Sequence, residues 1–109
     1  MKILITGSCG FIGFNITDYL LGTGHKIIGI DNLNDYYDVK IKYKRLKILK
    51  KYKNFKFFKI DISNNKNLKK IFNKNKFDFV INLAAQAGVR YSIDNPRKYI
   101  NSNTCGFYN

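Results

Sequence analysis

The stretch that decides the fold is KILITGSCGFIG, residues 2–13. Its first five residues are mostly apolar, which predicts a short buried strand. A turn with three evenly spaced glycines follows, and an amphipathic helix is expected from there to about Leu21. A second strand is predicted over residues 26–30, with the acidic residue Asp31 at its end. Strand, glycine-rich turn, helix, strand and acid stand in the order that a dinucleotide site requires.

The glycine turn has the chemistry to receive a diphosphate. Gly7 allows a tight turn out of the strand, Gly10 lets the diphosphate approach the backbone, and Gly13 lets the helix pack closely on the sheet. The amino end of the helix adds unpaired N–H groups and about half a positive charge. A purely structural turn is the alternative.

Asp31 points to the kind of dinucleotide. Its carboxylate would accept hydrogen bonds from the hydroxyls of the adenosine ribose and would repel a 2′-phosphate. The next residue is Asn32 rather than an arginine. NAD is therefore favoured over NADP, with an ordinary loop-start acid as the alternative.

Helical and strand patterns alternate along the rest of the chain. They predict, in order, a helix over 39–51, a strand over 55–60, a helix from about 64, a strand over 77–83, a loop over 84–93 and a helix opened by Pro96. The first of these helices is expected to bury Val39, Tyr43, Leu46 and Leu49, and the second Leu68, Ile71 and Phe72. Right-handed crossovers then give an α/β fold, a doubly wound parallel sheet with strand order 3-2-1-4.

Two further groups of residues follow strands of this sheet. Asp61 ends the third strand, where it could accept from the amino group of adenine or cap the next helix. The fourth strand ends in Leu83, Ala84 and Ala85, whose small size suits a backbone that passes under the ribose and phosphates. Tight packing of strand against loop is the alternative.

Composition limits the remaining functions. The chain has 109 residues, enough for one domain, and a net charge of +13. It holds 17 Lys but only three Arg, and Lys, Asn and Ile all have A/T-rich codons, so a solvated basic surface is favoured over a nucleic-acid partner. Two cysteines without metal-ligand spacing indicate free thiols and no metal site. With no signal peptide and no apolar run of about 18 residues, a soluble cytoplasmic protein without a membrane partner is expected.

Three segments carry a resemblance to a known family: 7–13, 31–39 and 82–92, the last continuing through Asn95, Pro96, Tyr99, Asn103 and Gly106. Over its whole length the chain resembles the N-terminal, Rossmann-fold part of an extended short-chain dehydrogenase/reductase of the NAD-dependent epimerase/dehydratase family. Within that family it is most similar to the UDP-glucuronate 4-epimerases. Sugar-nucleotide 4,6-dehydratases usually carry a His and an acidic residue where this chain has residues 88–90. A related dehydratase or decarboxylase and a non-catalytic NAD-binding module remain the alternatives.

The resemblance implies a role for each matching position. The diphosphate would lie on Gly7, Gly10, Phe11, Ile12 and Gly13; the adenosine ribose on Asp31, Asn32 and Asn34; adenine between Asp61 and Ile62; the path to the nicotinamide along Leu83, Ala84, Ala85 and Asn103; and the sugar-nucleotide near Gln86 and Arg90. A cation at Arg90 suits a phosphate or uronate group. An ordinary surface or helix-capping arginine is the alternative there.

The resemblance also implies what these residues lack. In this family the sugar gives a hydride from C4 to NAD and receives it back on the other face, with the tyrosine of a Tyr-x-x-x-Lys pair as base. That pair is expected beyond residue 109, together with the substrate lobe, so residues 1–109 are expected to be a truncated NAD-binding domain, inactive alone. Local matches at Tyr36/Lys40, Tyr43/Lys47 and Tyr52/Lys56 are expected by chance. The implied partners are a UDP-sugar, UDP-glucuronate first, a second copy in a homodimer, and a complementing C-terminal half.

Overall fold

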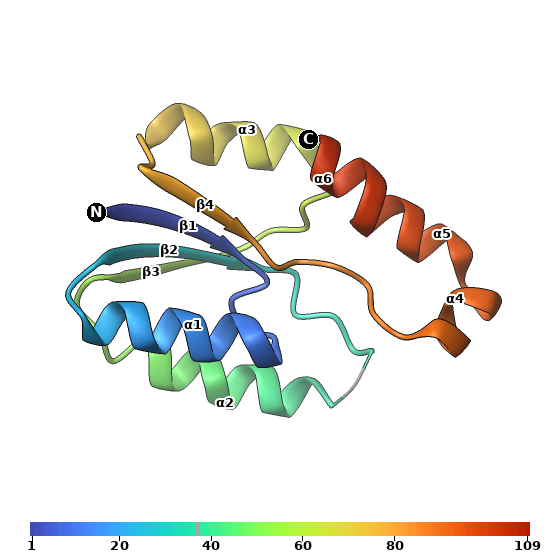
Figure 1. The fold of residues 1–109 in the computed structure, drawn as a ribbon, viewed down its shortest axis with the longest axis horizontal. Coiled ribbons are helices and arrows are strands. Elements are labelled where there is room, and N and C mark those ends of the chain that lie inside the picture. The colour runs from blue at the N-terminus through green and yellow to red at the C-terminus, as the bar shows by residue number, and fades with distance from the viewer. Residues whose placement is uncertain (37) are drawn as a thin grey trace.

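A four-stranded parallel sheet with helices on both faces forms the molecule (Figure 1). The computed structural model describes residues 1–36 and 38–109. Its elements are β1 (Lys2–Thr6), α1 (Phe11–Gly22), β2 (Lys26–Asp31), α2 (Val39–Leu49), β3 (Phe55–Lys59), α3 (Asn65–Lys74), β4 (Phe79–Asn82), α4 (Val89–Asp94), α5 (Pro96–Tyr99), the π-helix η1 (Ile100–Cys105) and α6 (Gly106–Tyr108). The strand order is β3-β2-β1-β4, with every pair parallel, which confirms the predicted doubly wound sheet.

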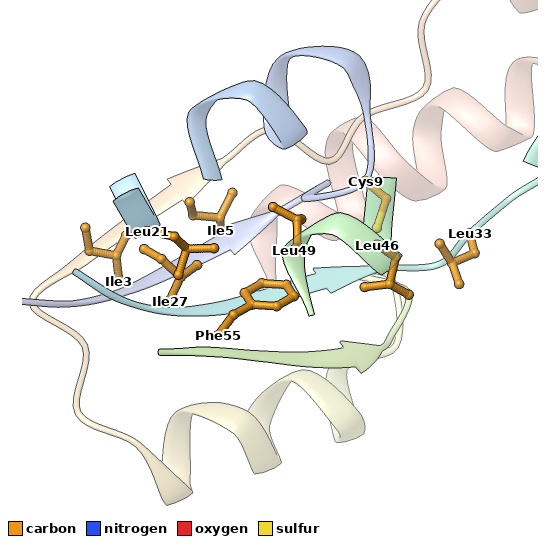
Figure 2. Packing of buried hydrophobic residues seen from close by; sticks show 9 residues of the cluster. All are labelled: Ile3, Ile5, Cys9, Leu21, Ile27, Leu33, Leu46, Leu49 and Phe55. Atoms are coloured by element: carbon orange, nitrogen blue, oxygen red, sulfur yellow. The ribbon is translucent and has the colours of Figure 1, made fainter. Parts of the chain in front are cut away.

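The two faces of the sheet carry separate cores. Figure 1 shows α1 and α2 on one face, and α3 with the run from α5 to α6 on the other. Alternate residues of β1 point to opposite faces, so Ile3 and Ile5 enter one core and Leu4 the other. The core on the α1 and α2 side is drawn in Figure 2 and consists of Ile3, Ile5, Cys9, Leu21, Ile27, Leu33, Leu46, Leu49 and Phe55.

The helices differ in detail from the predicted pattern. In α2 the buried residues are Lys42, Leu46 and Leu49, whereas Tyr43 is 50% exposed, so the expected place of Tyr43 in the core is wrong. Lys42 turns inward because its ammonium group pairs with the buried carboxylate of Asp31. In α3 the predicted Phe72 is 43% exposed, and its ring meets the edge of Phe77 rather than the core.

The segment after β4 is also more regular than predicted. Residues 89–93 of the expected loop belong to the short helix α4, and the chain then continues helically from Pro96 to Tyr108. The helical run returns to the sheet because the side-chain amide of Asn109 donates to the Ile62 carbonyl at 3.0 Å. The missed helix has only six residues, too few for a helical period to be recognised in the sequence.

β4 is an edge strand in the sheet of the described residues, because it pairs only with β1. Phe79 is 56% exposed and Val80 is 48% exposed, so apolar side chains of this strand face solvent. An unpaired edge with apolar side chains invites association with another chain.

No helix among the described residues is long and apolar enough to cross a membrane.

Candidate functional site

A cavity of about 370 Å³ opens at the carboxyl ends of the strands. β1 lies between β2 and β4. The crossover from β1 to β2 runs through α1 on one face of the sheet, and the crossover that leads to β4 runs through α3 on the other face (Figure 1). Open α/β sheets bind ligands at such a switch point. The wall combines the glycine turn with the ends of β2, β3 and β4. It consists of Gly7, Gly10, Phe11, Ile12, Gly13, Ile30, Asp31, Asn32, Asn34, Tyr36, Lys42, Ile60, Asp61, Ile62, Leu83, Ala84, Ala85, Gln86, Ala87 and Ser102.

The fold brings together nearly all the residues that the sequence proposed for a cofactor. Every one of them except Asn103 lies in this wall, and so does Gln86 from the proposed substrate pair. Arg90 is exposed and lies outside the wall. Sequence reasoning missed Lys42 and Tyr36 as wall residues, since both stand in segments that read as a polar loop and a solvated helix face. That these residues bind a cofactor or a substrate stays a prediction.

The glycine turn is fixed by close backbone contacts. Gly7 has a φ of +69°, and a Cβ on it would lie 2.8 Å from the Leu83 carbonyl oxygen. A Cβ on Gly13 would overlap the Gly7 carbonyl, so the third glycine makes room for the turn itself as well as for the helix. No side chain caps α1, and among the described residues the N–H groups of Phe11 and Ile12 donate to no protein acceptor. These donors and the helix dipole suit an anion.

Asp31 is a buried carboxylate, with a residue exposure of 5%. Its Oδ2 accepts from the Cys9 N–H at 3.1 Å, and its Oδ1 accepts from the Leu33 N–H at 2.8 Å. Lys42 Nζ lies 3.2 Å from the same Oδ1. Three of the roughly four acceptor positions of the carboxylate are therefore used inside the protein. The position that remains is an acceptor of the kind that a sugar hydroxyl needs.

Lys42 changes the electrostatics of this end of the cavity. Its side chain is 8% exposed, and Nζ also donates to the side-chain oxygen of Asn34 at 3.3 Å. The lysine thus holds two of the proposed ribose residues in one cluster. It also offsets the charge of Asp31, which matters because an unpaired buried charge is costly.

Thr6, at the end of β1, holds the part of the cavity wall that follows β4. The Thr6 hydroxyl donates to the side-chain oxygen of Asn82 at 2.5 Å and accepts the N–H groups of Leu83 and Ala84, both at 3.0 Å. This cluster fixes the backbone of the small apolar residues under the cavity. It explains why the wall formed by Leu83 and Ala84 can lie so close to Gly7.

Asn103 lies next to the cavity wall, beside Gln86. Its side chain lies outside the cavity wall, accepts from the Gln86 N–H at 2.8 Å and donates to the Gln86 carbonyl at 3.0 Å. Gln86 itself is buried, with an exposure of 6%. Asn103 therefore acts on the cavity indirectly, because it fixes the backbone of the wall residue Gln86.

Asp61 is both a wall residue and a local turn residue. Its Oδ1 accepts from the N–H of Ser63 at 2.9 Å and from its hydroxyl at 2.7 Å, and its Oδ2 accepts from the Asn32 amide at 3.1 Å. Burial acts to raise the pKa of Asp61, but these hydrogen bonds outweigh it and hold the pKa below 3.8. The cap of α3 is Asn64, whose side chain accepts from the Asn67 N–H. The alternative role of Asp61 as the helix cap is therefore wrong.

The Cys9 thiol and two of the three local Tyr/Lys pairs supply no reactive group to this cavity. In the third pair Tyr36 lines the wall, but Lys40 is exposed and lies outside it. Burial, and then the charge of Asp31, raise the pKa of the Cys9 thiol to about 12, so it is protonated at neutral pH. Tyr43 and Tyr52 lie outside the cavity wall, and the Tyr52 hydroxyl donates to Asp18 at 2.9 Å. The cavity therefore offers hydrogen-bonding groups, an anion site and a buried ion pair. These features are typical of a binding site.

Known proteins share this chain's sequence and fold. Protein CapI of Staphylococcus aureus is 53% identical over 109 residues, which are 100% of this chain and 32% of that protein. A UDP-glucuronate 4-epimerase of Thermodesulfobacterium geofontis is 52% identical over 106 residues, 97% of this chain and 33% of that protein. The chain thus spans about a third of the length of these relatives.

A solved structure agrees with these relatives. The UDP-glucuronic acid 4-epimerase of Bacillus cereus, in complex with UDP-glucuronic acid and NAD, superimposes with a TM-score of 0.87 at 32% identity, over 97% of this chain and 33% of that one. The family profile described as GDP-mannose 4,6 dehydratase matches residues 4–109. Because this match covers almost the whole chain, the chain belongs to that family of NAD-dependent epimerases and dehydratases.

Proposed function

We propose that residues 1–109 are the NAD-binding part of a nucleotide-sugar 4-epimerase that acts on UDP-glucuronate. One observation supports the proposal most strongly: the glycine turn and the buried carboxylate of Asp31 line the same cavity. The relatives support it, because a protein 52% identical is named as this epimerase and a structural neighbour was crystallised with NAD.

The cavity fits the two ends of a dinucleotide by their chemistry. The uncapped amino end of α1 suits the diphosphate, since the donors there face no protein acceptor among the described residues. The remaining acceptor position of Asp31 suits a ribose hydroxyl, and Lys42 holds that carboxylate in place. Asp31 disfavours a 2′-phosphate, which supports NAD over NADP. NAD bound there would supply reversible acceptance of a hydride from C4 of the sugar.

The chain's own residues would orient the cofactor and exclude water beneath it. Leu83 and Ala84 form an apolar part of the wall, and the Thr6 hydroxyl fixes their backbone. Gln86, held by Asn103, closes the wall on the side from which we propose that the sugar-nucleotide enters, and Arg90 would meet its phosphate or uronate group. We assign no catalytic base to residues 1–109 and expect no turnover from this chain alone.

Titration of the chain with NAD and with NADP tests the cofactor. We expect NAD to bind more tightly, and Asp31→Asn to weaken NAD binding by roughly tenfold or more, because a hydrogen bond to a charged group contributes about 1.5–3 kcal/mol. Asp94→Ala is the matched control, because Asp94 is an exposed carboxylate outside the cavity wall. Equal affinity for the two nucleotides, or an Asp31→Asn variant that binds like the wild type, would overturn the assignment.

Complementation tests the substrate. We propose that a separate polypeptide equivalent to the remaining two thirds of the Staphylococcus aureus relative pairs with the exposed edge of β4. Co-purification of the two pieces, followed by conversion of UDP-glucuronate to its C4 epimer, is the expected result. A complex that binds NAD but converts UDP-glucose in preference would move the assignment to a different nucleotide-sugar.

A further inference from the structure

Three tyrosine rings from three segments meet beside the cavity. Tyr36 comes from the loop after β2, Tyr91 from α4 and Tyr99 from α5. The ring centroids of Tyr36 and Tyr91 are 4.7 Å apart at an angle of 46°, and those of Tyr91 and Tyr99 are 6.1 Å apart at 54°. These separations are typical of favourable aromatic pairs. We refer to Tyr36, Tyr91 and Tyr99 as the tyrosine cluster.

The cluster is bonded to the backbone of the cavity wall. The Tyr99 hydroxyl donates to the Ala87 carbonyl at 2.7 Å and lies within hydrogen-bonding distance of the Gly88 carbonyl. Burial raises the pKa of Tyr99, as do its neighbours Tyr36 and Tyr91, so this hydroxyl stays protonated and able to donate at neutral pH. Ala87 is itself a wall residue, so the contact fixes one side of the cavity from outside.

Gly88 joins the two sides of the cluster. Its φ of +101° is one that residues with a Cβ rarely adopt. The space that such a Cβ would fill is occupied by the Tyr36 hydroxyl. The loop after β2 is therefore seated directly on the backbone that leads to α4.

A lysine completes the outer side. Lys98 Nζ lies 2.6 Å from the Tyr91 hydroxyl and 5.3 Å from the centroid of the same ring. A cation over an aromatic face is attracted to it, so Lys98 holds Tyr91 between α4 and α5. Each of these contacts joins two different segments: Tyr36 with Tyr91 joins the loop after β2 to α4, and Tyr91 with Tyr99 and Lys98 joins α4 to α5. The tyrosine cluster therefore links three segments of the chain.

We propose that the tyrosine cluster is a clasp that positions residues 86–90 against the loop after β2, so that a bound dinucleotide and the loop carrying Gln86 and Arg90 are ordered together. The inference rests on the proposed function for the identity of the dinucleotide. Tyr36 lines the cavity on the side of Asn34 and Asp31, and it touches Gly88 on the other. Tyr36, Tyr91 and Tyr99 are positioning residues in this scheme.

Two of the three arginines of the chain, Arg45 and Arg90, provide a direct assay, and the third, Arg97, lies within α5. An arginine-specific protease can cut after Arg45, within α2, and after Arg90, within α4. Cleavage after Arg90 reports local opening of the clasped loop, and cleavage after Arg45 reports loss of the fold as a whole. Tyr36→Leu removes one ring of the clasp, and Tyr99→Phe removes only the hydroxyl. Both changes leave the amino-acid sequence on either side of the Arg90 bond unaltered.

Without nucleotide, we expect both variants to be cut after Arg90 roughly three- to tenfold faster than the wild type, because each loses one aromatic or hydrogen-bonded contact. Cleavage after Arg45 should be unchanged. Tyr43→Leu is the matched control, since Tyr43 is 50% exposed on α2. Variants cut after Arg90 at the wild-type rate would overturn the clasp.

Saturating NAD separates this inference from the proposed function. In the wild type NAD should slow cleavage after Arg90, and in Tyr36→Leu that protection should be lost at a saturating concentration. Equal protection in both proteins would refute the coupling. A wild type that gives no heat of binding with NAD would refute the proposed function, while the nucleotide-free comparison would still decide the clasp.

Discussion

Replacing Lys42 with methionine tests the buried ion pair at the base of the cavity. Lys42 Nζ lies 3.2 Å from Asp31 Oδ1, and the two side chains are 8% and 4% exposed. Methionine keeps most of the length and an apolar stem, and it removes the ammonium group with its charge and its hydrogen bonds to Asp31 and Asn34. The substitution therefore leaves a carboxylate in the core without its counter-charge.

The structure sets the size of the effect. Removing one partner of a buried pair costs about 3–5 kcal/mol. Asp31 keeps hydrogen bonds from the N–H groups of Cys9 and Leu33 at 3.1 and 2.8 Å, so we expect the lower end for Lys42→Met, about 3 kcal/mol. The double variant Asp31→Asn, Lys42→Met should return to within about 1 kcal/mol of the wild type, because a buried pair can be replaced by neutral groups at little cost.

Urea unfolding followed by far-UV circular dichroism and tyrosine fluorescence measures these energies, and the chain has no tryptophan to obscure the tyrosine signal. Lys44→Met is the control, since Lys44 lies on the exposed side of the same helix. If Lys42→Met costs no more than Lys44→Met, or if the double variant is as unstable as the sum of its single changes, the two charges do not act as a buried pair.

Three other features give shorter tests. A thiol-reactive disulfide reagent at pH 8 should modify Cys105 alone in the folded chain and both thiols after unfolding, because burial holds the pKa of Cys9 at about 12. That pKa lies above the value of 9.0 for a free thiol, so the unfolded chain loses the proton first and the free energy of unfolding should fall as the pH rises above 9, less so in Cys9→Ala. Gly13→Ala should destabilise by about 2 kcal/mol or more and lower NAD affinity, because its Cβ would overlap the Gly7 carbonyl; calorimetry measures both, and an unchanged melting temperature would contradict the geometry. Phe79→Thr should reduce concentration-dependent self-association in sedimentation velocity, because Phe79 is 56% exposed on an edge strand, and equal association of both proteins would exclude that edge as the contact.

The fold could be predicted because its strands and long helices have strong local patterns. The centre of β1, residues 3–5, is uniformly apolar since both faces of the strand are covered there, and the glycine turn fixes where the strand ends. The helix predicted from about residue 64 is α3, and the Asn64 side chain caps it. The residues at the ends of parallel strands necessarily meet at one edge of the sheet, so the wall of the cavity followed from the strand order.

The burial of Lys42, the contact of Asn103 and the helix α4 depend on contacts between residues that are far apart in the sequence, so no local sequence pattern predicts them. Lys42 is buried only because Asp31, eleven residues earlier, offers it a partner. Asn103 acts on Gln86 across 17 residues, a distance that hides the pair from any window of the sequence. α4 is held by ring contacts with Tyr36 and Tyr99 rather than by an apolar stripe of its own. These cases need the tertiary structure because the stabilising partner is remote in the chain.

The hydrogen bonds of Thr6 join positions that are 76 to 78 residues apart. A ribosome adds about 5–20 residues per second, so β1 waits roughly 4–15 s after synthesis before the backbone of β4 exists to pair with it. During that interval the central strand of the sheet has a vacant side. The cavity at the carboxyl ends of the strands is accordingly among the last parts of the molecule that can form as the nascent chain emerges, and non-local pairing of this kind is slow and exposed to aggregation.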